Sequence, residues 1–150
     1  LDSRGEPIPS DWVAVKMRVA PKLLGRPIAA DAHGNTAEVD SVANPDNLFY
    51  SEAMRTLFIG EDSGAHVNNA LWAYNVDTQT LTRILTLAAG AESTGLQVVE
   101  NIAGHAYILS NAQHQGEFAE TIPADLKAQL EPLIDRFQAP VGYIGGLPGL

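Results

Sequence analysis

The sequence predicts an all-β-dominated fold that ends in a short helical segment. Between residues 46 and 87, short runs rich in β-branched and aromatic side chains alternate with clusters of turn-forming residues, which is typical of strands joined by tight turns. Beyond residue 117, the apolar residues change to the spacing of a helix face. The chain has 150 residues and is 45% hydrophobic, which is enough for one globular core.

Four strands are expected in the first of these regions. They cover residues 46–52, 56–60, 70–76 and 81–87. Polar turn clusters at 61–64 and 75–80 follow the second and third strands. Four short strands joined in this way form the antiparallel meander of a β-propeller blade, whose repeat length is roughly 40–50 residues. We therefore predict antiparallel four-stranded blades of a β-propeller.

The strand pattern partly restarts after residue 90. Glu92 stands among small polar residues before an apolar run, as Asp46 does, and residues 105–111 match residues 56–62. The chain would then hold about one and a half blades, because the repeat stops after its second strand. Two copies with different strand spacing also fit an ordinary β-sandwich, and this alternative stays open.

The C-terminal region, residues 117–150, is expected to hold a helical segment and a tail. Its apolar residues on one helix face are Leu126, Leu130, Leu133, Ile134 and Phe137. The helix is expected to begin near Pro123, and Pro132 must kink it or divide it into two short helices. The glycine-rich stretch 142–149 is expected to be a terminal strand or tail.

The N-terminal region, residues 1–45, is rich in loop-forming residues. One strand is expected over residues 12–19, with alternate valines and a methionine on its buried face. We interpret the segments 1–45, 46–116 and 117–150 as parts of one larger domain. One and a half blades leave strand edges unpaired, so the remainder of the propeller is expected from an upstream chain or a partner chain.

Composition excludes several classes of protein. The net charge of −9 argues against a nucleic-acid partner, because such partners are held largely by Lys and Arg. No apolar run reaches the roughly 18 residues of a membrane-spanning helix, and the first residues lack the apolar core of a leader. The chain has no cysteine, which excludes disulfides, thiolate metal sites and a cysteine nucleophile.

Carboxylates near the predicted strand ends are candidate metal ligands. Asp46 and Glu92 precede equivalent strands, so in a propeller they would point toward a common axis, and Glu61 and Asp62 follow another strand. Further candidate ligands are Asn44, Asn47, His66 and His114. Calcium takes six to eight oxygen ligands, and the carboxylates and amides are of the right type. The sequence therefore predicts a calcium site, with no residue assigned to catalysis.

Each of these residues also has a purely structural interpretation. Asn44 and Asp46 flank Pro45 and can cap a turn through hydrogen bonds to nearby backbone. The pair Glu61 and Asp62 is an ordinary acidic hairpin turn when taken alone. A histidine near a strand end is more often a hydrogen-bonded structural group than a ligand. Both interpretations stay open for these residues.

Six short motifs follow one another between residues 20 and 116. They are Asn-Pro-Asp-Asn at 44–47, Phe-Ile-Gly-Glu-Asp at 58–62, Leu-Trp-Ala-Tyr at 71–74, Leu-Thr-Arg-Ile at 81–84, Gly-Ala-Glu-Ser-Thr-Gly-Leu at 90–96 and Ser-Asn-Ala-Gln-His at 110–114. In this order they resemble the C-terminal portion of the PhoX-like bacterial alkaline phosphatases. One departure is Gln115, where that family usually has proline.

The resemblance implies an exported β-propeller enzyme, periplasmic or secreted, that hydrolyses phosphate monoesters with calcium and iron. Calcium in such an enzyme would hold phosphate oxygens and lower the pKa of an attacking water. The iron site of the family uses a cysteine from outside this region. Because the chain has no cysteine, we do not expect it to assemble iron alone, and we expect it to be inactive alone.

Three functions stay open at this point. The chain is the C-terminal part of a metal-dependent phosphatase, or a non-catalytic propeller segment whose carboxylates hold structural calcium while its surface serves protein association. The third alternative is a propeller hydrolase of lactones or organophosphates that uses calcium alone. The fold by itself does not decide between them.

Overall fold

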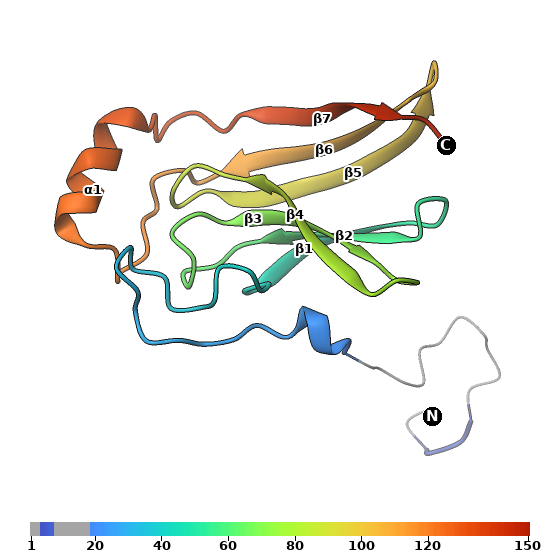
Figure 1. The fold of residues 1–150 in the computed structure, drawn as a ribbon, viewed down its shortest axis with the longest axis horizontal. Helices are drawn as coiled ribbons and strands as arrows, with labels where there is room; N and C mark the ends of the chain where they lie inside the picture. Colours follow the sequence, from blue (N-terminus) through green and yellow to red (C-terminus); the bar gives the residue numbers. More distant parts are fainter. Residues whose placement is uncertain (1–3, 8–18) are drawn as a thin grey trace.

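The computed structural model describes residues 4–7 and 19–150, which form two antiparallel β-sheets and one short helical segment (Figure 1). The two sheets are stacked, and the helical segment lies at one end of the stack. A 3-10 turn, η1 (Pro21–Leu23), precedes the first sheet. The strand expected over residues 12–19 lies, apart from Val19, outside the described residues.

The first sheet is a four-stranded meander. Its strands are β1 (Pro45–Ser51), β2 (Thr56–Glu61), β3 (Ala70–Asn75) and β4 (Thr80–Thr86), paired in the order β1-β2-β3-β4. The β3–β4 turn forms because the Asn75 side-chain oxygen accepts hydrogen bonds from the backbone N–H groups of Asp77 and Thr78. The antiparallel four-stranded sheet predicted from residues 46–87 is thereby confirmed.

The second sheet takes its third strand from the end of the chain. It consists of β5 (Glu92–Ile102), β6 (His105–Gln113) and β7 (Val141–Pro148), in the order β5-β6-β7. Between β6 and β7 the chain forms α1 (Ala124–Leu130) and a 3-10 turn, η2 (Glu131–Leu133). The stretch that we expected to be a strand or tail is therefore a strand, paired antiparallel with β6.

The apolar face expected for the C-terminal helix is not buried. The α-helix ends at Leu130, and Pro132 lies in the 3-10 turn that follows, as expected for a residue that cannot continue the helix. Neither element buries a residue, and Leu133 and Phe137 are 80% and 101% exposed. The spacing of these apolar residues therefore predicted the right kind of element, and the structure leaves two of them, Leu133 and Phe137, in solvent.

Two clusters of apolar side chains form the core, one on each side of the first sheet. The cluster between the two sheets is built on Phe58, Leu71, Val98 and Ile108. The cluster on the opposite side is built on Val42, Ile59, Ala70, Trp72 and Tyr74, and Ala20 and Leu23 pack against it. Each fully buried large side chain contributes ~1.5–3 kcal/mol, so both faces of the first sheet are stabilised.

Stacked antiparallel sheets are common to propellers and to sandwiches. Among residues 4–7 and 19–150, the two sheets form no closed ring. The structure therefore confirms a mostly β fold with antiparallel sheets, and the propeller remains a proposal, taken up below.

A fully buried carboxylate ties the first sheet to the segment before it. Glu61, the last residue of β2, is 0% exposed. Its oxygens accept hydrogen bonds from the backbone N–H groups of Ala43 (2.7 Å) and Ala70 (2.9 Å) and from the Trp72 indole N–H (2.8 Å). Because a buried charge is tolerated only when it is paired and hydrogen-bonded, this network fixes where the segment before β1 crosses the sheet.

His66 completes the network around Glu61. Its Nδ1 lies 3.1 Å from a Glu61 oxygen and its Nε2 lies 3.3 Å from the backbone oxygen of Glu38. Both neighbours accept hydrogen bonds, so the ring satisfies both only when both nitrogens carry hydrogen. Burial alone would lower the pKa of His66, but the hydrogen bond to Glu61 and the charge of that carboxylate outweigh burial and raise it above the ordinary 6.5.

Glu61→Gln is expected to lower the free energy of unfolding by about 3–5 kcal/mol. The glutamine NH₂ group would face buried N–H groups that now donate to the carboxylate, so buried donors would lose their acceptor, and His66 would lose its counter-ion. Urea denaturation measures the loss. Glu52→Gln is the control, since the Glu52 side chain is 78% exposed, and it should leave the midpoint nearly unchanged. A Glu61→Gln variant as stable as the unmodified chain would contradict the role given to this carboxylate.

The raised pKa of His66 predicts that its contribution to stability is lost at alkaline pH. Below 6.5 the ring is protonated in the folded and unfolded states alike, so its contribution is complete, and it disappears as pH rises through the folded-state pKa. Unfolding free energies measured from slightly acidic to alkaline pH should show this decline. The decline should be absent in His66→Gln and retained in His105→Gln, a change at an exposed histidine.

Candidate metal centre

Three carboxylates converge where the two sheets meet. One oxygen from each of Asp46, Asp62 and Glu92 lies within 4.8 Å of the others. Asp46 is the second residue of β1, Asp62 follows the last residue of β2, and Glu92 is the first residue of β5. The three side chains can hold a metal ion, and the sequence interpretation had selected all of them.

Strand pairing explains the first two positions. β1 and β2 are antiparallel and Pro45 pairs with Glu61, so the start of β1 lies beside the end of β2. The backbone N–H of Asp62 donates to the backbone oxygen of Asn44 at 3.2 Å, and the Ser63 hydroxyl donates to the Asn44 side-chain oxygen at 3.0 Å. Asn44 holds this geometry in the left-handed region, with a φ of 41°, which asparagine tolerates better than most residues.

A close contact between the sheets brings Glu92 to the same place. A Cβ atom at Gly60 would lie 2.2 Å from the backbone oxygen of Ser93, so only glycine lets β2 and β5 approach this closely. The buried Asn69 side chain fixes the same junction, because it accepts from the N–H of Ser63 and donates to the backbone oxygen of Ala91. The spacing of the three carboxylates is thus set by the backbone around them.

Crowding of negative charge is the main electrostatic feature of the cluster. Burial raises the pKa of Glu92, and a hydrogen bond with Asp62, the charge of Asp62 and the charge of Asp46 raise it further, while His114 opposes the change. Without a cation, Glu92 therefore retains its proton to higher pH than an ordinary glutamate. A bound cation would compete with that proton.

An open cavity of about 420 Å³ lies beside the cluster. Asp62 and Glu92 line it, together with His114, Glu117 and Phe118 from the segment after β6. The Gln113 amide donates to His114 Nε2 at 2.7 Å, so His114 carries its hydrogen on Nδ1, which lies 3.4 Å from a Glu117 oxygen. Asp62 and Glu92 therefore face a space that is large enough for a small ligand.

The structure separates the other candidate ligands from this cluster. Glu61 uses its oxygens for the four donors described above and lies outside the cluster, and His66 belongs to the Glu61 network. Asn47 donates to an Asp46 oxygen at 2.8 Å, so its amide nitrogen orients a carboxylate. Asn44 orients the turn at Asp62. Of the two histidines, only His114 borders the cavity.

Sequence reasoning missed Glu117 and gave Asn69, a residue of the right type to bind calcium, no role in joining the sheets. Asn69 is buried and joins the two sheets, and Glu117 lines the cavity beside the cluster. The pair Asn68-Asn69 just before β3 was a usable signal, because asparagine there can hydrogen-bond neighbouring backbone. No local pattern marked Glu117, which comes near the cluster only through the path of the chain after β6.

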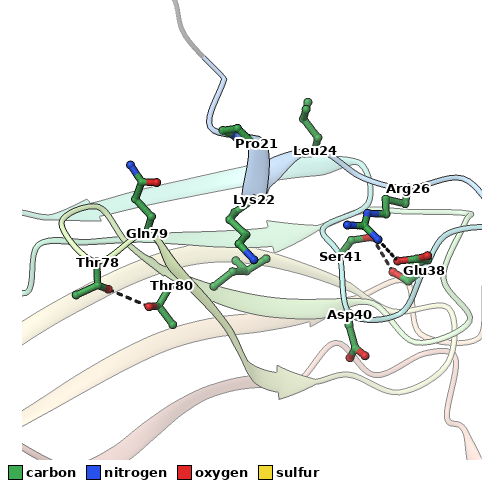
Figure 2. A pocket seen from close by; sticks show the side chains of 11 residues that line it. Pro21, Lys22, Leu24, Arg26, Glu38, Asp40, Ser41, Thr78, Gln79 and Thr80 are labelled. Atoms are coloured by element: carbon green, nitrogen blue, oxygen red, sulfur yellow. Dashed lines mark hydrogen bonds and ion pairs between the residues drawn. The ribbon is translucent and has the colours of Figure 1, made fainter.

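A larger cavity of about 560 Å³ lies on the other side of the first sheet, between η1 and the β3–β4 turn (Figure 2). Lys22, Arg26 and Glu38 line it, and an ion pair of 3.2 Å joins Arg26 to Glu38. The hydroxyl groups of Thr78 and Thr80 are hydrogen-bonded to each other. Its polar groups are therefore mostly engaged with one another, and the smaller cavity is the better candidate site.

Comparisons of this chain with protein-family models, with curated proteins and with solved structures found no match. The resemblance to the PhoX-like phosphatases therefore stays a prediction. In the described part of the chain, every helix is too short or too polar to cross a lipid bilayer.

Glu92→Gln is expected to stabilise the cation-free protein at neutral pH. The folded-state pKa of Glu92 lies above its ordinary 4.5, so ionising this group as pH rises through that pKa costs stability, and glutamine removes the cost. Thermal unfolding in chelator measures the effect. Glu120→Gln, which removes a carboxylate from the cavity wall outside the cluster, should leave the midpoint unchanged. A lower midpoint for Glu92→Gln would contradict the crowding of charge described here.

Proposed function

We propose that this chain binds a divalent cation through Asp46, Asp62 and Glu92, and that the cation is calcium. The observation that carries the proposal is the convergence of these carboxylates from three strand ends. Like charges this close repel one another, and a bound cation or a shared proton would relieve that repulsion. Burial raises the pKa of Glu92, and the hydrogen bond with Asp62 and the charges of Asp62 and Asp46 raise it further.

The donor set suits calcium better than iron. All three groups offer oxygen, the ligand type that calcium prefers, and none offers sulfur or an imidazole nitrogen. Three carboxylates provide three to six of the six to eight oxygens around calcium, which leaves positions for water or phosphate. This chain alone would not assemble the family's iron site, because the cysteine of that site comes from outside this region and this sequence has none.

The function that this site supports best is a part in the hydrolysis of phosphate monoesters. When bound, calcium would neutralise charge on a phosphate group and activate water for attack. The chain's own carboxylates would hold and orient the cation at the mouth of the cavity. His114, whose Nδ1–H lies against Glu117, borders the same cavity and would contact the bound phosphate.

The same proposal makes the chain part of a β-propeller whose other sheets come from an upstream chain or a partner chain. The support is that Asp46 and Glu92 stand at equivalent places, at the starts of the first strands of two stacked sheets. Propellers bring such positions together around their axis. An exported protein, periplasmic or secreted, is the location that the resemblance implies.

A structural cation is the second candidate function. It is favoured by the position of the cluster at the junction of the two sheets, where a cation would join β1 to β5. It is also favoured by the absence of an evident nucleophile among the residues that line the cavity, since the Ser63 hydroxyl donates to Asn44. The third alternative, a calcium-only hydrolase of lactones or organophosphates, has no separate observation in its favour.

Calcium is expected to raise the unfolding temperature of the chain, since a ligand at 100 times its Kd stabilises the folded state by about 2.7 kcal/mol. Differential scanning calorimetry with increasing calcium measures this. Asp46→Asn and Glu92→Gln should remove the calcium effect, while Glu120→Gln retains it. Equal calcium stabilisation in all variants would show that the cation binds elsewhere.

Phosphate binding separates the catalytic candidate from the structural one. If the cation holds a substrate phosphate, inorganic phosphate should bind the calcium-loaded chain and should not bind in chelator, as measured by isothermal titration calorimetry. His114→Gln should weaken phosphate binding without changing the calcium effect on unfolding temperature. Calcium stabilisation with no phosphate binding would favour the structural cation.

A further inference from the structure

The cavity beside the carboxylate cluster is lined by acidic groups beyond the cluster itself. Glu117 and Glu120 line it in addition to Asp62 and Glu92, and no lysine or arginine of the described residues does. The Glu120 carboxylate is exposed and has no ion-pair partner in the described part of the chain. A divalent cation would offset two of the three charges of the cluster, which leaves Glu117 and Glu120 uncompensated. The cavity therefore favours positive charge in addition to that cation.

Backbone contacts hold the acidic wall of the cavity in place. Residues 117–120 form this wall, in the segment between β6 and α1 at one end of the stacked sheets (Figure 1). A Cβ atom at Gly90 would lie 2.5 Å from the backbone of Glu117, and one at Gly34 would lie 2.6 Å from the backbone oxygen of Thr121. The Thr121 hydroxyl also donates to the backbone oxygen of Gly34. Both ends of the wall are thus fixed, which keeps its acidic side chains beside the cavity.

Phe118 gives the same wall an aromatic surface. Glu117 directly precedes Phe118 in the chain and Glu120 follows it two residues later, and the half-buried ring lines the cavity. Aromatic rings attract cations to their faces, and the Lys127 ammonium lies 5.7 Å from the centroid of this ring. Lys127 itself is not among the residues that line the cavity. A ring with two carboxylates near it is suited to the ammonium group of a ligand.

The size of the cavity indicates a small ligand. Its volume of about 420 Å³ is near the lower end of the roughly 300–1,000 Å³ of ligand pockets. A phosphate ester with an uncharged alcohol would bring only negative charge into this acidic space, so Glu117 and Glu120 would repel it. A phosphate ester that carries its own positive charge would instead be attracted by them. The charge of the wall therefore selects among phosphate esters.

We propose that the substrate of this site is the phosphate monoester of an amino alcohol. Its phosphate group contacts the cation held by the cluster, and its ammonium group lies against Phe118 and is attracted by Glu117 and Glu120. This inference rests on the proposed function, because it names the substrate class of the same site. In the reaction, the oxygen of water bonds to phosphorus and the bond from phosphorus to the ester oxygen breaks. One proton of the water goes to that ester oxygen, so phosphate and the amino alcohol are released.

A matched pair of esters tests the inference. Aminoethyl phosphate and ethyl phosphate differ by the ammonium group alone, and each is titrated into the calcium-loaded chain by isothermal titration calorimetry. Aminoethyl phosphate should bind about fivefold more tightly, which is the upper end for one exposed charge pair. The difference should shrink as salt is added, because salt screens exposed charges.

Variants of the cavity wall locate the ammonium group. Glu120→Gln should at least halve the ratio of the two Kd values, and so should Phe118→Leu, whereas Phe118→Tyr should retain the ratio. Glu52→Gln is the matched control, since this side chain is 78% exposed in the turn after β1, outside the cavity. Because the ratio is taken within one variant, a general loss of phosphate binding cancels.

The outcomes separate this inference from the proposed function. Equal affinity for the two esters would overturn the inference and leave the proposed function standing. A preference for aminoethyl phosphate that survives both Glu120→Gln and Phe118→Leu would also overturn it, since the ammonium group would then bind elsewhere. If neither ester binds in the presence of calcium, the proposed function fails and the inference fails with it.

Discussion

The buried carboxylate of Glu61 is the constraint on which the rest of the structure depends. It gathers donors from the segment before β1, from β3 and from a histidine, and it does so from the end of β2. Because a charge in this position must be fully satisfied, the three segments have little freedom to shift against one another. Asp62 follows Glu61 directly in the chain, and Asn44 follows Ala43, so the structural network places the residues that orient the candidate metal centre.

Glu61 and the carboxylate cluster accommodate negative charge in opposite ways. Glu61 is buried among donors and its charge is compensated within the protein. Asp46, Asp62 and Glu92 meet where no described cation side chain approaches them closely, apart from the influence of His114 on Glu92. The first group therefore stabilises the fold by itself, whereas the second stabilises it fully only when a proton or a metal ion is shared between its members.

Local patterns were sufficient to predict the first sheet and three residues of the candidate site. The strands between residues 46 and 87 have tight turns and regular spacing, and the likeness of the starts of β1 and β5 identified Asp46 and Glu92. The role of Glu61 could not be read from its neighbours, because Glu61 and Asp62 look alike in the sequence and only the fold buries one and exposes the other. The pairing of β7 with β6 depends on contacts distant in the chain, which no local pattern records.

The contact between Gly60 and Ser93 has a consequence for ion-size selectivity. The distance from the Asp62 end of β2 to the Glu92 end of β5 is set by two backbones that touch, so it resists adjustment by side-chain rotation alone. Magnesium demands short, nearly octahedral bonds, while calcium accepts longer and more varied ones. This close backbone approach sets the distance between the carboxylates of Asp62 and Glu92. A larger residue at position 60 would increase that distance and so favour larger ions.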